Sequence, residues 1–182
     1  MNGELVGTWV VDRATHSFVY DATWLRSPKV RSLSLSLPIT ASREVRGDAV
    51  ANYFDNLLPD NDRIRERLSR RFETKSADAF SLLEAIGRDC VGAVQLLPEE
   101  KTPTGWNRVD CEPLDEGQIA EILRAVPADV GPGALGQPDD DLFRISIAGA
   151  QEKTAFTQAG GRWCRPHGAT PTTHIFKLPL GL

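Results

Sequence analysis

Residues 128–141 are the stretch that most limits how this chain can fold. They contain three glycines, two prolines and four aspartates. A segment of that composition buries too little apolar surface to pack as a helix or a strand. We therefore expect a mobile linker there, with a longer packed region before it and a shorter one after it.

The longer region begins with signals for a small antiparallel sheet. Three segments have the β-branched and aromatic content or the alternation of strands: residues 5–11, 18–20 and 31–37. Asn2 and Gly3 form a hairpin-turn signal, although only Met1 precedes them. This pattern suggests a hairpin whose first strand was lost by truncation or by a late start assignment.

Four further segments have the apolar spacing of amphipathic helices. They start at residue 48, at residue 61 or 62, at residue 76 and at residue 115. Asp48 is the expected N-cap of the first helix, which ends at Pro59, and Gly87 is the expected left-handed C-cap of the third, which covers residues 76–86. A short strand is expected at residues 91–97, and the fourth helix should end before Pro127.

Strand patterns return beyond the linker. Alternation begins at residues 143–147, strand character resumes at 154–157, and the last strand covers 174–178. Gly160 and Gly161 form a turn signal between the last two of these segments. The whole pattern predicts an α+β fold, a small antiparallel sheet with helices followed by part of a second lobe.

We divide the chain into three parts on this basis. An N-terminal subdomain covers residues 1–100, a connecting helix and the linker cover residues 101–141, and residues 142–182 carry a glycine-containing loop and a lysine-bearing strand.

Charge and composition exclude several classes of protein. A net charge of -4 and a pI near 5.4 argue against non-specific binding to nucleic acid. The second helix carries five arginines: Arg63, Arg65, Arg67, Arg70 and Arg71. A solvated helix face is favoured for them over a patch that contacts a partner or DNA, because charge runs on helices are usually exposed.

The sequence shows no sign of a membrane or metal protein. No apolar run is long enough to span a bilayer, and the N-terminus does not resemble a leader, so we expect a cytoplasmic protein. Cys90, Cys111 and Cys164 are odd in number and lack C-x-x-C spacing. They predict neither a disulfide framework nor a metal site.

A candidate for chemistry is the small-residue loop at residues 146–154, Ser-Ile-Ala-Gly-Ala-Gln-Glu-Lys-Thr. Small side chains let backbone N–H groups approach a phosphate, and the lysine supplies a positive charge. A Walker A loop does not fit, because Glu152 stands where that motif needs a second glycine and a strand follows instead of a helix.

Lys177 is a second candidate, because it is the one charge in the strand-like run Ile-Phe-Lys-Leu. Protein kinases lay a glycine-containing hairpin over ATP and reach its phosphates with a lysine from their third strand. A structural turn and a lysine that extends to water remain the plainer interpretations of the two features. Nucleotide binding and these interpretations are about equally supported by the residues themselves.

Several segments of the chain resemble segments of one known protein family. Residues 144–154 strongly resemble the phosphate-binding segment of the HipA family of toxin kinases. Residues 53–59 and 86–94 resemble that family's N-terminal subdomain, and residues 163–164 and 170–179 resemble its lysine-bearing strand. The resemblance covers essentially the whole chain, and it identifies the second lobe as part of a protein-kinase-like N-lobe.

The resemblance implies an ATP- and Mg²⁺-dependent serine/threonine kinase of a type II toxin–antitoxin pair. It further implies restraint by a DNA-binding HipB-like antitoxin, contact with DNA only through that antitoxin, and glutamyl-tRNA synthetase as the substrate by analogy. The positions that would contact the ATP phosphates are Ala148, Gly149, Ala150, Gln151, Glu152 and Lys153, and Lys177 would also contact ATP. Ser146 would be autophosphorylated, and phosphate there would repel ATP and switch the enzyme off.

The resemblance also sets an expectation about activity. The chain ends at Leu182, and the family's catalytic aspartate, metal-binding aspartate and adenine-cradling hinge all lie further on. Without them the barrier to phosphoryl transfer is not lowered, so we expect no kinase activity from these residues alone. Two other hypotheses stay open, a regulatory subunit that binds an antitoxin or a separate kinase subunit, and the product of a decayed gene.

Overall fold

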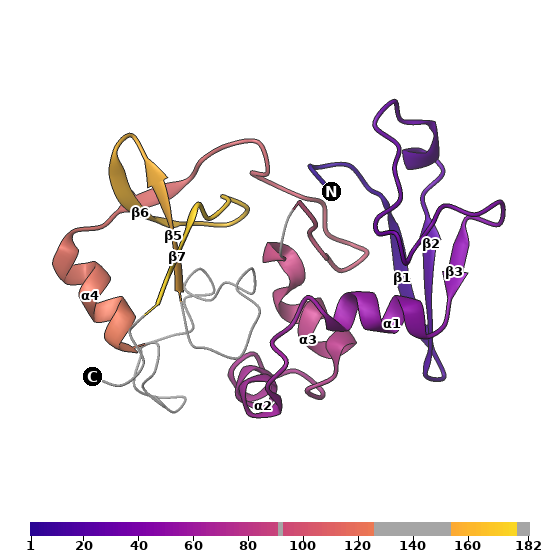
Figure 1. Cartoon of the computed structure of the whole chain (residues 1–182), viewed down its shortest axis with the longest axis horizontal. Helices are drawn as coiled ribbons and strands as arrows, with labels where there is room; N and C mark the ends of the chain where they lie inside the picture. Colours follow the sequence, from indigo (N-terminus) through magenta and orange to yellow (C-terminus); the bar gives the residue numbers. More distant parts are fainter. Residues whose placement is uncertain (91–92, 126–153, 178–182) are drawn as a thin grey trace.

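The structure is a computed structural model that describes residues 1–90, 93–125 and 154–177. Within these ranges the chain forms four α-helices and two antiparallel sheets (Figure 1). The prediction of an α+β fold is therefore confirmed. The described part contains no helix that is both long and apolar enough to cross a bilayer.

The first sheet has three strands in the order β1-β2-β3. They are β1 (Gly7–Asp12), β2 (Thr15–Tyr20) and β3 (Glu44–Arg46). Trp9 pairs with Phe18, and Phe18 pairs with Val45 on its other side, so the three side chains share one face. That face carries the large apolar side chains of the sheet.

Three helices follow the first sheet: α1 (Asp48–Asp55), α2 (Asp62–Arg71) and α3 (Ala79–Ile86). Asn61 caps α2, because its side chain accepts hydrogen bonds from the backbone N–H groups of Arg63 and Ile64. Asp78 caps α3 by accepting from Ser81 N at 3.0 Å. Short 3-10 turns lie at η1 (Trp24–Arg26) and η2 (Gly87–Asp89).

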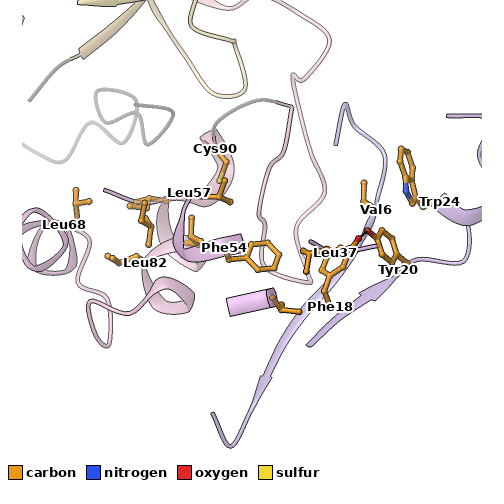
Figure 2. Packing of buried hydrophobic residues seen from close by; sticks show 14 residues of the cluster. Val6, Phe18, Tyr20, Trp24, Leu37, Phe54, Leu57, Leu68, Leu82 and Cys90 are labelled. Atoms are coloured by element: carbon orange, nitrogen blue, oxygen red, sulfur yellow. Dashed lines mark hydrogen bonds between the residues drawn. The ribbon is translucent and has the colours of Figure 1, made fainter. Parts of the chain in front are cut away.

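The sheet and the three helices enclose one apolar core. The ring of Trp9 stacks on that of Phe54 from α1, with 4.0 Å between centroids and 12° between planes. Figure 2 shows Phe54 pointing from its helix toward Phe18 and Leu37. The buried members are Val6, Phe18, Tyr20, Trp24, Leu37, Val50, Phe54, Leu57, Leu58, Leu68, Leu82, Leu83, Ile86 and Cys90.

Two polar contacts hold loops and helices to this core. The Tyr20 hydroxyl accepts from Leu33 N at 2.8 Å and donates to Leu37 O, which fixes both ends of residues 33–37. Arg65 of α2 forms a bidentate contact with the Asp55 carboxylate, at 2.6 and 3.1 Å, and also donates to Pro59 O. The Asp55 carboxylate raises the pKa of Arg65, so one of the five arginines of α2 is used to fasten α2 to α1.

The second sheet has the order β4-β6-β5-β7. Its strands are β4 (Cys111–Pro113), β5 (Thr154–Ala159), β6 (Arg162–Pro166) and β7 (His174–Phe176). The predicted turn at Gly160 and Gly161 is confirmed, with φ of 57° and 76°. Such angles suit a two-residue hairpin turn. Helix α4 (Glu116–Ala125) lies beside this sheet (Figure 1).

A second, smaller core forms between α4 and the second sheet. Its buried members are Leu114, Ile119 and Phe156. Ile122, Leu123, Trp163 and Phe176 pack around them and stay partly exposed. The boundaries proposed at residues 100 and 141 stay a prediction.

Two predicted strands are wrong. Residues 31–37 form a loop with a single bridge between Ser34 and Leu37, because the Tyr20 hydroxyl closes the segment on itself and β1 and β3 already occupy both edges of β2. Residues 93–97, the described part of the segment at 91–97, are not a strand either. There Leu96 N donates to Gly87 O at 2.7 Å, which turns the chain back onto the end of α3.

Two predicted caps differ in detail. Gly47 is the N-cap of α1, with φ of 91°, and Asp48 is the first residue of the helix. Gly87 has φ of -72°, so it is not the expected left-handed cap. It is needed for another reason, since a Cβ atom there would lie 2.8 Å from the Cβ of Leu96. Helix α3 begins three residues later than predicted, at Ala79 instead of Ser76.

The turn at the start of the chain is confirmed. Asn2 and Gly3 have φ of 50° and 76°, and Glu4 N donates to Met1 O at 3.0 Å. Trp106 packs directly against Gly3, where a Cβ atom would come within 2.2 Å of its ring. The segment that leaves the first region therefore returns to contact the first residues of the chain.

Candidate nucleotide-binding site

The pairing of β5 with β7 positions the candidate lysine. Thr154 pairs with Phe176, Ala155 with Ile175 and Phe156 with His174. Phe176 immediately precedes Lys177, and Thr154 is the last residue of the glycine-containing loop at 146–154. The register therefore brings the last residue of that loop beside the residue before Lys177.

Lys177 itself is exposed and lies one residue beyond the end of β7. The sequence predicted Lys177 within a strand, among apolar neighbours. In the structure it lies just after the strand, where water reaches its ammonium group, so the charge is not buried. An exposed ammonium is available to a phosphate group.

The loop between β6 and β7 is held by threonine hydroxyls. Thr157 of β5 donates its hydroxyl hydrogen to Pro171 O at 2.6 Å. Thr173 N donates to Phe156 O at 3.0 Å, and the Thr173 hydroxyl accepts from Gln158 N at 2.8 Å. These bonds fasten the loop along β5 and so fix where β7 begins.

A second attachment joins this loop to the segment before β4. Thr170 is 1 % exposed, and its hydroxyl both accepts from Asp110 N at 2.8 Å and donates to Asp110 O at 2.9 Å. His167 N also donates to Asp110 O at 2.8 Å. A buried hydroxyl with both its donor and acceptor used is a satisfied and therefore stabilising contact.

Two side chains of β7 pack against aromatic rings of β5 and β6. The ring of Phe176 meets Phe156 and Trp163 edge to face, with centroids 4.9 and 5.0 Å apart. His174 meets Trp163 in the same way at 4.8 Å. Because such pairs fix ring orientation as well as burying area, they hold β7, the strand that ends just before Lys177, in one position.

The other predicted site residues lie outside the described residues. These are Ser146, Ala148, Gly149, Ala150, Gln151, Glu152 and Lys153. Of the candidate phosphate contacts, Lys177 alone is placed, and its role stays a prediction. Among the described residues no group of three or more His, Cys, Asp or Glu side chains is arranged to hold a metal ion.

The positioning role of Thr157, Thr170 and Thr173 was not predicted from the sequence. A usable signal was present, because the run Thr-Pro-Thr-Thr precedes the last strand. Threonine hydroxyls in such runs often bond to backbone groups instead of letting the segment join a regular element. Asp110, the partner of Thr170, could not be identified, since it bonds through its backbone groups, which a sequence pattern does not reveal.

Known proteins resemble this chain along most of its length. The sequence model of the family described as HipA N-terminal domain matches residues 1–97. The chain belongs to the HipA family. That match covers the first sheet, helices α1 to α3 and the larger core.

Two relatives from Sinorhizobium fredii (strain NBRC 101917 / NGR234) extend the similarity beyond that domain. The protein named "Putative kinase Y4mE" is 34% identical over 183 residues, which cover 98% of this chain and 42% of the relative. The protein named "Putative kinase Y4dM" is 33% identical over 171 residues, covering 89% of this chain and 36% of the relative. This HipA-family chain thus spans about two-fifths of the length of the relatives it matches.

A solved structure has the same fold. It is HipA of the Shewanella oneidensis MR-1 toxin–antitoxin system, determined with HipB and operator DNA. The TM-score is 0.64 at 22% sequence identity, and the match covers 96% of this chain and 39% of the other. The likeness places both sheets within a HipA fold.

Proposed function

We propose that this chain is the N-terminal portion of a HipA-like serine/threonine kinase and that its second sheet binds the phosphates of ATP. The observation that carries the proposal is the register of β5 and β7, in which Thr154 lies opposite Phe176. It brings the end of the glycine-containing loop and Lys177 to the same end of the sheet.

The chemistry of these positions suits an ATP phosphate. Lys177 offers an exposed ammonium, and loop residues 148–153 offer small side chains, backbone N–H groups and Lys153. A phosphate between two lysines and backbone N–H groups is attracted by the positive charges and oriented by the hydrogen bonds. Mg²⁺ would accompany ATP and neutralise part of its charge, and Ser146, at the start of the loop, would accept the regulatory phosphate.

Phosphoryl transfer is proposed for the whole protein and not for these residues by themselves. The chain spans 42% and 36% of the two curated relatives, which are both named as kinases. We expect the 182 residues to bind ATP weakly and to transfer no phosphoryl group. The substrate, by analogy glutamyl-tRNA synthetase, belongs to the same proposal.

The partner we propose is a HipB-like antitoxin in the cytoplasm, with DNA reached only through it. The support is the Shewanella structure, in which HipA is found together with HipB and operator DNA. Size-exclusion chromatography of this chain mixed with a HipB-like protein tests the idea. Separate elution of the two proteins at micromolar concentration would argue against binding through this portion.

Nucleotide binding is tested by titrating a fluorescent ATP analogue in the presence of Mg²⁺. Lys177→Gln should weaken binding by about tenfold or more, because a charge-assisted hydrogen bond contributes about 1.5–3 kcal/mol. Lys101→Gln is the matched control, since Lys101 is also an exposed lysine but lies in the loop before β4. Equal affinities of the two variants would remove Lys177 from the site, and no binding by any form would count against an ATP site in this portion.

A further inference from the structure

Two of the three free cysteines are brought together by the second sheet. Cys111 begins β4 and Cys164 lies in β6, far away in the sequence. In the β4–β6 ladder Cys111 pairs with Pro166, and Pro113 pairs with Cys164. Because side chains alternate along a strand, both thiols point to the same face as diagonal neighbours.

The surroundings of the two thiols differ. Cys164 is 3 % exposed, whereas Cys111 is half-buried at the edge of the sheet. Burial raises the pKa of the Cys111 thiol, and the adjacent Cys164 thiol raises it further. The Asp110 carboxylate also raises the pKa of Cys111, and the Arg162 guanidinium lowers it by less. The two sulfur atoms are close enough to influence each other, and solvent reaches them from the Cys111 side.

A direct disulfide does not match this arrangement. Diagonal neighbours on adjacent strands have Cα atoms about 7–8 Å apart. The Cα atoms of a disulfide are usually about 4.4–6.8 Å apart. A bond between the sulfur atoms would therefore require β4 to move, whereas an ion placed between them spans a longer distance without that movement.

We propose that Cys111 and Cys164 form a two-thiolate site for a soft monovalent metal ion of the Cu(I) type. Thiolate sulfur is the ligand that such ions prefer, and Cu(I) is satisfied by two of them. On binding, the ion displaces one proton from each thiol to solvent, and the resulting complex carries one negative charge.

The ion would fasten β4 to β6. Strand β4 has three residues and lies at the edge of the sheet, so among the described strands it pairs with β6 alone. It continues through Leu114, a member of the second core, into α4. Binding therefore stabilises the second core, independently of whether the sheet binds ATP.

The test is a titration of the reduced chain with Cu(I) under anaerobic conditions, in competition with a chromophoric Cu(I) chelator. The unsubstituted protein should remove one ion per chain from the chelator and show a higher Tm with the ion bound. Cys111→Ser and Cys164→Ser should each lose this uptake and the shift in Tm. Cys90→Ser is the matched control, because Cys90 is buried in the other core and its thiol donates to Gly87 O at 3.0 Å, as a serine hydroxyl can.

Cys111→Ser is the decisive variant, since a half-buried residue at a strand edge tolerates the change better than Cys164 does. Folding of each variant is checked by circular dichroism before titration. In the unsubstituted protein, bound Cu(I) should also slow alkylation of Cys111. Undiminished uptake by Cys111→Ser, or no uptake by the unsubstituted chain, would overturn the proposal.

Discussion

The two sheets of this molecule are supported in different ways. The first packs with three helices around a core of 14 buried residues, which include Phe18, Tyr20, Trp24 and Phe54. Among the described residues, the second packs with one helix around a smaller apolar cluster, whose buried members are Leu114, Ile119 and Phe156. In the second region, threonine hydroxyls and edge-to-face rings supplement a small apolar core.

The larger core and the candidate site therefore lie in different regions of the molecule. The candidate nucleotide site lies on the second sheet, at the end of β7. Elements that bind ligands are commonly drawn from the less stable parts of a fold, because they have to adjust. We infer that the first region supplies most of the stability and that the second gains stability when it binds its ligands.

The largest effect should come from the first core. Phe54→Ala removes a ring that is 2 % exposed and stacked on Trp9, and it leaves a cavity among large neighbours. We expect a loss of about 4 kcal/mol in the free energy of unfolding of that region. Hydrogen exchange followed by mass spectrometry should show faster exchange in β1 and β2 and unchanged exchange in β5 and β6.

Phe156→Ala is the counterpart in the second core. Phe156 is also 2 % exposed, but its neighbours are partly exposed and can close over the gap. We expect a loss of about 3 kcal/mol in the free energy of unfolding of the second region, at the lower end for such a change. Faster hydrogen exchange should be confined to β5, β6 and β7. If this substitution also loosened β1 and β2, the two cores would form one cooperative unit and the comparison would fail.

Thr170→Val tests the hydroxyl attachments of the second region. The change removes the two hydrogen bonds between the Thr170 hydroxyl and the backbone N–H and C=O groups of Asp110. We expect a loss of about 1–3 kcal/mol in urea unfolding. Thr102→Val, at an exposed position in the loop before β4, is the control and should change little. Equal losses in both variants would show that the buried hydroxyl has no special part.

The smallest effect should come from a helix cap in the first region. Asn61→Ala removes the side chain that accepts from Arg63 N at 2.9 Å. Loss of an N-cap costs about 1 kcal/mol, and thermal unfolding should show a modest drop in Tm. Asp60→Ala, just before the cap, serves as the control. A drop in Tm as large as that of Phe54→Ala would mean that the stability of the whole region depends on the start of α2.

The four helices and the turn at Gly160 could be predicted from the sequence, because apolar spacing and glycine pairs are local signals. Strands β3 and β4 were not predicted, because their sequences Glu-Val-Arg and Cys-Glu-Pro contain no run of β-branched or aromatic residues. Residues 31–37 alternate serine and leucine as a strand does, yet Leu35 is fully exposed at the tip of a loop. The long-range bonds to Tyr20 decide that outcome, and no local pattern reveals them.

The candidate site shows the same limit. Lys177 was found by its isolated charge, and the glycine-containing loop by its composition. That Thr154 lies opposite Phe176 follows from strand register, which depends on the partner strand. The proximity of Cys111 and Cys164 also depends on register, so their spacing in the sequence gave no sign of it.

The most direct test of an ATP site on the second sheet is a two-dimensional NMR titration of the labelled chain with ATP and Mg²⁺. Amide shifts should change at Thr154, Phe176 and Lys177, where the register joins the loop to the lysine. The amide chemical shifts of β1 and β2 should not change. Changes gathered on the first sheet, or none at Thr154 and Lys177, would contradict the account.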